Sequence, residues 1–114
     1  MIFSITHRCN LHCKGCYARA LHPSANDDMS EEKLKSIFSE GRELGISFAV
    51  LAGGEPLVRP EILDITQQYP EIISLMFTNG TLIDDAVLAR FRAQRNLVPV
   101  ISMEGYQEDT DGRR

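Results

Sequence analysis

Short apolar segments alternate with amphipathic segments along this chain of 114 residues. Runs rich in β-branched and aromatic side chains predict strands at residues 1–6, 47–51, 71–77 and 96–102. Helical spacing of apolar residues predicts helices between them, at residues 31–44, from Pro60 to Pro70 and at residues 83–94. This order, β-α-β-α-β-α-β, predicts an α/β fold with a parallel sheet and right-handed crossovers.

The ends and buried faces of these elements also have local signals. Ser30 is a good N-cap for the first helix, and Gly45 stands where a left-handed residue would end it. In the third helix the predicted inner face carries Val87, Leu88 and Phe91. The polar residues 22–28 indicate a loop. Pro99 is awkward in the fourth strand if that strand is central, because proline donates no hydrogen bond to the ladder.

The predicted sheet lacks closure, because the sequence ends soon after the fourth strand and leaves that edge unpaired. We therefore expect a fragment, at about the N-terminal half of a larger catalytic domain. The tail 106–114 is polar and without periodicity, and we assign no role to Arg113 or Arg114.

Composition excludes several classes of protein. The formal net charge is −4, which gives no electrostatic case for nucleic acid as the main ligand. No apolar run approaches the ~18 residues that a membrane span needs, and residues 1–8 lack the apolar region of a signal peptide. The 3 cysteines are odd in number and clustered, which favours thiol chemistry in a reducing cytoplasm over a disulfide framework.

Those cysteines, Cys9, Cys13 and Cys16, have the spacing C-x3-C-x2-C directly after the first predicted strand. Cysteine thiolates hold iron–sulfur clusters, and three thiolates on a cluster of four irons leave one iron open to another ligand. Three alternatives remain. Zinc would add His7, His12 or His22, the cysteines would line one apolar helix face, or they would be redox thiols.

Other unusual motifs follow the remaining strands. They are Gly53-Gly54-Glu55-Pro56 after the second, Thr78-Asn79-Gly80 after the third and Met103-Glu104-Gly105 after the fourth. The carboxyl ends of parallel strands meet at one edge of a sheet, so we expect these motifs and the cysteines to share one site. Taken singly, the first two motifs have a simpler explanation, because Gly53-Gly54 and Asn79-Gly80 suit turns and Glu55 suits a helix start.

The cysteine spacing, its place after a strand and the Gly-Gly-Glu-Pro motif together resemble the radical S-adenosylmethionine (radical SAM) superfamily. The fourth-strand segment, residues 101–105, resembles members that carry extra cluster-binding C-terminal domains. The resemblance covers nearly the whole chain and implies that residues 1–114 are the incomplete N-terminal part of a radical SAM core, a partial TIM-like (β/α) barrel. Two positions depart from the family pattern. Gly15 stands where an aromatic residue is common, with Tyr17 close by, and Glu104 stands where aspartate is expected.

The resemblance also implies a set of site residues and partners. The metal ligands are Cys9, Cys13 and Cys16, which would bind three irons of a [4Fe-4S] cluster while SAM binds the fourth. The implied SAM-binding residues are Tyr17, Gly53, Gly54, Glu55, Pro56, Asn79, Ser102 and Glu104. One electron would cleave SAM into methionine and a 5′-deoxyadenosyl radical, which abstracts hydrogen from a small-molecule or peptide substrate, in peptide or tetrapyrrole cofactor maturation. The expected partner is a reductant such as flavodoxin or ferredoxin, with no nucleic acid and no membrane, in the cytoplasm. The alternative is a non-enzymatic zinc or iron–sulfur module that carries electrons.

Overall fold

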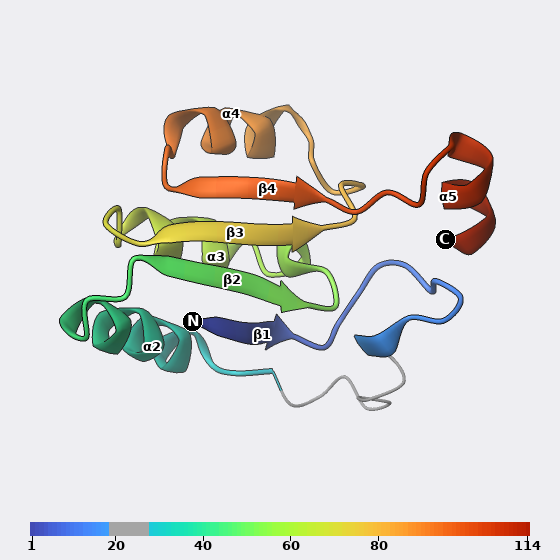
Figure 1. The fold of residues 1–114 in the computed structure, drawn as a ribbon. Helices are drawn as coiled ribbons and strands as arrows, with labels where there is room; N and C mark the ends of the chain where they lie inside the picture. Colours follow the sequence, from blue (N-terminus) through green and yellow to red (C-terminus); the bar gives the residue numbers. More distant parts are fainter. Residues whose placement is uncertain (19–27) are drawn as a thin grey trace.

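The structure is a computed structural model that describes residues 1–18 and 28–114. Its centre is a four-stranded parallel sheet in the order β1-β2-β3-β4 (Figure 1). The strands are β1 (Ile2–Thr6), β2 (Phe48–Gly53), β3 (Ile73–Thr78) and β4 (Leu97–Ile101). All four predicted strands are confirmed, as is the parallel α/β fold.

Three helices connect the strands where the sequence predicts them. They are α2 (Glu31–Glu43), α3 (Glu61–Gln67) and α4 (Asp85–Ala93), and the 3-10 turn η1 (Pro56–Val58) precedes α3. Ser30 caps α2, since its side chain accepts from the backbone N–H of Lys33 at 3.2 Å. Gly45 follows α2 with φ +71°, the left-handed conformation that the sequence predicts there.

A further helix, α5 (Gln107–Arg113), occupies the tail in which sequence periodicity gives no element. Its one buried residue is Thr110, whose hydroxyl accepts from the backbone N–H of Glu104 at 3.1 Å. The helix has no apolar stripe, so polar contacts hold it. Figure 1 shows α5 beside the loop that follows β1.

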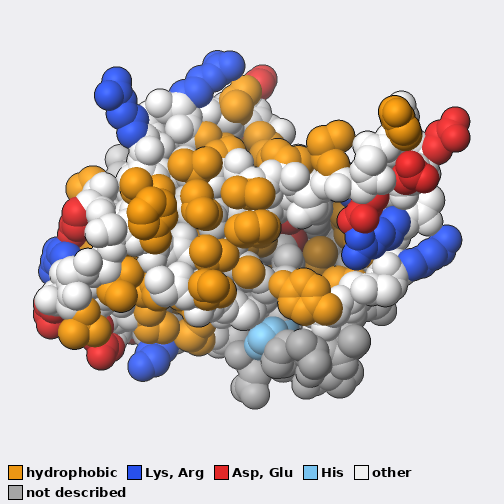
Figure 2. Space-filling view, in the orientation of Figure 1, with side chains coloured by type: hydrophobic (Ala, Val, Ile, Leu, Met, Phe, Trp, Pro, Cys, Tyr) orange, Lys and Arg blue, Asp and Glu red, His pale blue; other side chains and the backbone are white. Residues whose placement is uncertain are grey.

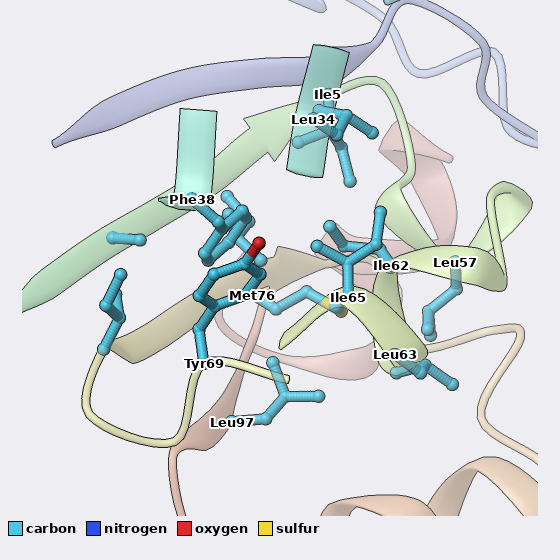
Figure 3. Close-up of a cluster of buried hydrophobic side chains, with 13 residues drawn as sticks. Ile5, Leu34, Phe38, Leu57, Ile62, Leu63, Ile65, Tyr69, Met76 and Leu97 are labelled. Atoms are coloured by element: carbon cyan, nitrogen blue, oxygen red, sulfur yellow. The ribbon is translucent and has the colours of Figure 1, made fainter. Parts of the chain in front are cut away.

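The hydrophobic core lies between one face of the sheet and helices α2 and α3 (Figure 3). Phe38 of α2 is fully buried, with its ring 5.8 Å from that of Phe3 and 5.4 Å from that of Tyr69. The other fully buried apolar side chains are Ile5, Leu34, Ala49, Leu51, Ile62, Ile65, Ile72 and Met76. The core therefore fixes β1 and β2 against α2, which sets where the loop after β1 begins.

Helix α4 packs less closely than its sequence predicts. Val87 and Phe91 are half-buried against the core, but Leu88 is 37% exposed, so its predicted place on the inner face is wrong. The helix packs against the last strand, β4, and two of its three predicted inner residues contact the core.

The opposite face of the sheet carries side chains of alternate strand residues, including Phe48, Ile73, Phe77 and Val98, all more than a third exposed. Figure 2 shows hydrophobic side chains gathered over this face. Pro99 lies in β4, which is an edge strand of the described sheet, so its missing N–H is tolerated. Among the described residues, no helix has the length and apolar character needed to cross a membrane.

Candidate functional site

The carboxyl ends of all four strands open onto one cavity of about 430 Å³. Its wall includes most of the predicted site residues: Cys9, Cys13, Cys16, Tyr17, Gly53, Gly54, Asn79, Ser102 and Glu104. The structure therefore brings the cysteine motif together with residues from the segments that follow the other three strands, as a parallel sheet requires. Of the predicted set, Glu55 and Pro56 do not line the cavity.

The three cysteines follow β1 in one loop, each half-buried and none in a disulfide. Gly15 takes φ +67° between Cys13 and Cys16, and the N–H of Cys16 donates to the carbonyl of Cys13 at 3.4 Å. Burial raises the pKa of the Cys9 thiol, although the N–H of Leu11 opposes this by donating to its sulfur at 3.4 Å. All three cysteines of this loop line the same cavity.

The donor set suits a cluster of several irons. Within residues 1–18 and 28–114, no three His, Cys, Asp or Glu side chains converge on a point that one metal ion would occupy. The three thiols instead share the wall of a single cavity, and each cysteine of an iron–sulfur cluster binds a different iron. Of the predicted zinc partners, His12 is exposed and His22 lies outside the described residues.

Asp28 anchors the start of the cysteine loop. Its carboxylate accepts from the hydroxyl of Thr6 at 2.9 Å, from the backbone N–H of His7 at 2.9 Å and from Nε of Arg8 at 2.7 Å. Burial of the carboxylate opposes ionisation, but these hydrogen bonds outweigh it and hold the pKa of Asp28 below its usual value. Asp28 lies at the end of the predicted loop 22–28, whose other residues are outside the described part.

Gly53 and Gly54 let the end of β2 approach the loop after β1. A Cβ on Gly54 would collide with the carbonyl oxygen of Arg8 and lie 2.6 Å from its carbonyl carbon. Gly53 has φ +131° and a Cβ there would collide with the carbonyl oxygen of Thr6. The N–H of Gly54 donates to Thr6 at 2.8 Å, and that of Glu55 donates to Arg8 at 2.8 Å. The glycines are therefore required by the protein's own backbone, next to the cysteines.

Glu55 is fully buried and satisfied by protein donors. Its Oε1 accepts from the hydroxyl of Thr78 at 2.7 Å and from the N–H of Leu57 at 3.0 Å. Its Oε2 accepts from the N–H of Asn79 at 2.7 Å. The carboxylate thus caps η1, as the helix-start interpretation predicts, and ties the end of β2 to the end of β3. Pro56 is buried beside it as the first residue of η1.

Asn79 links the end of β3 to the cysteine loop. Its Nδ2 donates to Oδ1 of Asn10 at 3.0 Å and lies 3.9 Å from Sγ of Cys9. Asn10 in turn donates to the hydroxyl of Thr81 at 2.8 Å. The turn that follows β3 is consequently bonded to the residues that begin the cysteine motif.

Helix α5 closes the other side of the cavity, where sequence reasoning finds no role for its residues. The guanidinium of Arg114 donates to the carbonyls of Ser102 at 2.7 Å and Asn79 at 2.9 Å. Arg113 pairs with Glu104, and its carbonyl accepts from the N–H of Lys14 at 2.9 Å. Both arginines line the cavity, and only their place beyond the fourth strand signals this in the sequence.

The remaining wall is apolar. Apart from Thr78 at the end of β3, it consists of Leu11 from the cysteine loop and of Val50, Ala52 and Phe77, which belong to the open face of the sheet. Strand periodicity places residues 50 and 52 on one face, so the signal for them lies in the sequence. Tyr17 is 64% exposed at the edge of this wall.

Residues 3–114 match the Radical SAM superfamily, and the chain belongs to this family. Its members are enzymes that use a [4Fe-4S] cluster and SAM. The matched range includes all four strand ends that form the cavity.

Relatives of several activities share this part of the chain. Fe-coproporphyrin III synthase of Methanosarcina barkeri is 27% identical over 97% of this chain. The probable GTP 3′,8-cyclase of Methanothermobacter marburgensis is 37% identical over 72% of it. The aligned region is 28% of the length of each. Among solved structures, Streptococcus suis SuiB bound to S-adenosylmethionine has a TM-score of 0.79 at 19% identity, over 99% of this chain and 28% of SuiB.

Proposed function

We propose that residues 1–114 form the part of a radical SAM core domain that holds the [4Fe-4S] cluster and SAM. One observation carries this proposal: three cysteines from a single loop line one cavity at the carboxyl ends of four parallel strands. A cubane cluster held by these three cysteines keeps one iron free for SAM. Cys9, Cys13 and Cys16 are the proposed iron ligands.

When bound, the cluster supplies one electron for the reductive cleavage of SAM, by which this family produces a 5′-deoxyadenosyl radical for hydrogen abstraction. The chain's own residues shape the space for SAM. Gly53 and Gly54 present backbone rather than side chains to the cavity, and Ser102 and Glu104 line it from the segment that follows β4. Tyr17 offers an exposed ring at the rim. Glu55 acts from below the wall, by holding Asn79 in place.

We infer a substrate of the peptide or tetrapyrrole class, with a flavodoxin or ferredoxin as reductant in the cytoplasm. The relatives named Fe-coproporphyrin III synthase and PqqA peptide cyclase support the substrate class, and SuiB has a structure with its precursor peptide SuiA. Three unpaired thiols support a reducing compartment.

The test is anaerobic reconstitution of the protein with iron and sulfide, followed by reduction and EPR spectroscopy with and without SAM. We expect a cubane signal that shifts when SAM is added, because SAM would bind the open iron. A cubane signal that ignores SAM favours the electron-carrier alternative, and uptake of zinc alone contradicts the proposal.

Single variants identify the ligands. Cys9→Ser, Cys13→Ser and Cys16→Ser should each lose most of the cluster absorbance. His12→Ala is the matched control, because His12 belongs to the same loop and is exposed. It should retain the cluster, whereas a zinc site that uses His12 would lose its metal.

A further inference from the structure

The carboxamide of Asn79 is held more firmly than a turn requires. Its Oδ1 accepts from the N–H of Thr81 at 2.9 Å and from the hydroxyl of Thr81 at 2.6 Å. Its backbone N–H donates to the buried carboxylate of Glu55 at 2.7 Å. Together these bonds fix the side chain's orientation, so the direction of its Nδ2 is set by the fold.

Two acceptors face that nitrogen, Oδ1 of Asn10 at 3.0 Å and Sγ of Cys9 at 3.9 Å. The turn preference of Asn-Gly explains Oδ1, which closes the turn, but it gives no reason for the amide nitrogen to point at the cysteine loop. Cys9 also receives the backbone N–H of Leu11 at 3.4 Å. In the described part of the chain, the sulfur of Cys9 thus accepts from both a backbone N–H and a side-chain amide.

We propose that Asn79 tunes the cluster through the sulfur of Cys9, a role that rests on the proposed function. An N–H donor stabilises negative charge on a thiolate, and hydrogen bonds to cluster sulfurs are among the factors that set a cluster's potential. One-electron reduction adds negative charge to the cluster, so the donor favours the reduced form and raises the potential. Asn79 is thus a positioning and tuning residue, with Glu55 as its support.

The test is the midpoint potential of the reconstituted protein, measured without SAM by dithionite titration under EPR. Asn79→Ala removes the donor. At the wild-type midpoint we expect its ratio of reduced to oxidised cluster to fall about threefold, the effect of one long hydrogen bond at the weak end of the usual range. At 59 mV per tenfold for one electron, this is a negative shift of about 28 mV.

Two further variants separate tuning from loosening of the loop. Asn10→Ala removes a side-chain amide of the same size from the same group of hydrogen-bonded residues and leaves the Asn79 donor in place. The midpoint potential of this variant should therefore equal that of the wild type. Asn79→Asp keeps the acceptor that closes the turn and replaces the donor, so its shift should be at least that of Asn79→Ala.

An unchanged potential in Asn79→Ala, or an equal shift in Asn10→Ala, overturns the inference while the cluster and its response to SAM remain. Failure of the wild-type protein to take up a cubane cluster overturns the proposed function, and this inference with it. The same set of measurements therefore distinguishes failure of the Asn79 inference from failure of the proposed function.

Discussion

Gly54→Ala should be severely destabilising, for a reason that is purely steric. The added methyl would overlap the carbonyl of Arg8, lying 2.6 Å from its carbon and 3.0 Å from the carbonyl oxygen of His7. Overpacking of this kind costs about 1–3 kcal/mol. Pushing apart the two backbone segments, residues 53–55 and 6–8, also weakens the hydrogen bonds from Gly54 to Thr6 and from Glu55 to Arg8, at about 0.5–1.5 kcal/mol each. The expected loss is about 2–6 kcal/mol, a large share of a typical stability of ~5–15 kcal/mol.

Urea unfolding followed by circular dichroism measures this loss. Gly112→Ala is the control, because a Cβ there meets nothing within 4 Å and Gly112 lies inside α5. Alanine should stabilise that helix by about 0.5–1 kcal/mol. A loss below about 1 kcal/mol in Gly54→Ala would refute the steric argument, since the backbone contact would then have room to relax.

Three other substitutions test the surroundings of the site. Glu55→Gln keeps the shape but turns an amide toward the N–H of Asn79 or the donors on Oε1, so urea unfolding should show a loss of about 1.5–3 kcal/mol. Asp28→Asn tests pH dependence. In the folded protein the pKa of Asp28 lies below its ordinary value of 3.8. The ionised carboxylate therefore contributes to folding stability above pH 3.8, and this contribution is lost as the pH falls through the folded pKa. The stability gap between wild type and Asp28→Asn in acid titrations should therefore narrow below pH 3.8, and a constant gap would contradict this. Lys14→Ala removes the bond from Nζ to the carbonyl of Gly112, and should speed amide exchange in α5 at a cost of under about 1 kcal/mol.

The candidate site was predictable where local sequence carries the chemistry. The cysteine spacing predicts a metal-binding loop, and the strand ends predict the partners that meet it. Glu55 shows the limit of this reasoning. Its sequence is compatible with a ligand-binding carboxylate and with a cap, and only the position of Thr78 and Asn79 from the next strand decides that protein donors surround it.

Helix α5 and the residues Arg113 and Arg114 were beyond sequence reasoning for a different reason. Periodicity detects helices that bury an apolar face, and α5 buries only Thr110. Its place depends on polar contacts with Lys14, Ser102 and Asn79. For Leu88 the prediction of burial was wrong for the opposite reason. Its apolar side chain has helical spacing, but it stays exposed because helix α4 lies at the margin of the sheet.

The sequence by itself determined the order of the four strands and of the helices α2, α3 and α4, the parallel sheet and the common edge at which the motifs meet. These follow from apolar periodicity and caps, which are local, and from the handedness of crossovers, which is general. Only the tertiary structure decided which groups face the cavity and which support it from within. A side chain's partners come from other strands at distances of a few ångström, and local sequence holds no record of them. For that reason Gly54 and Glu55 are one motif in sequence, but in space Gly54 lines the cavity and Glu55 lies buried behind its wall.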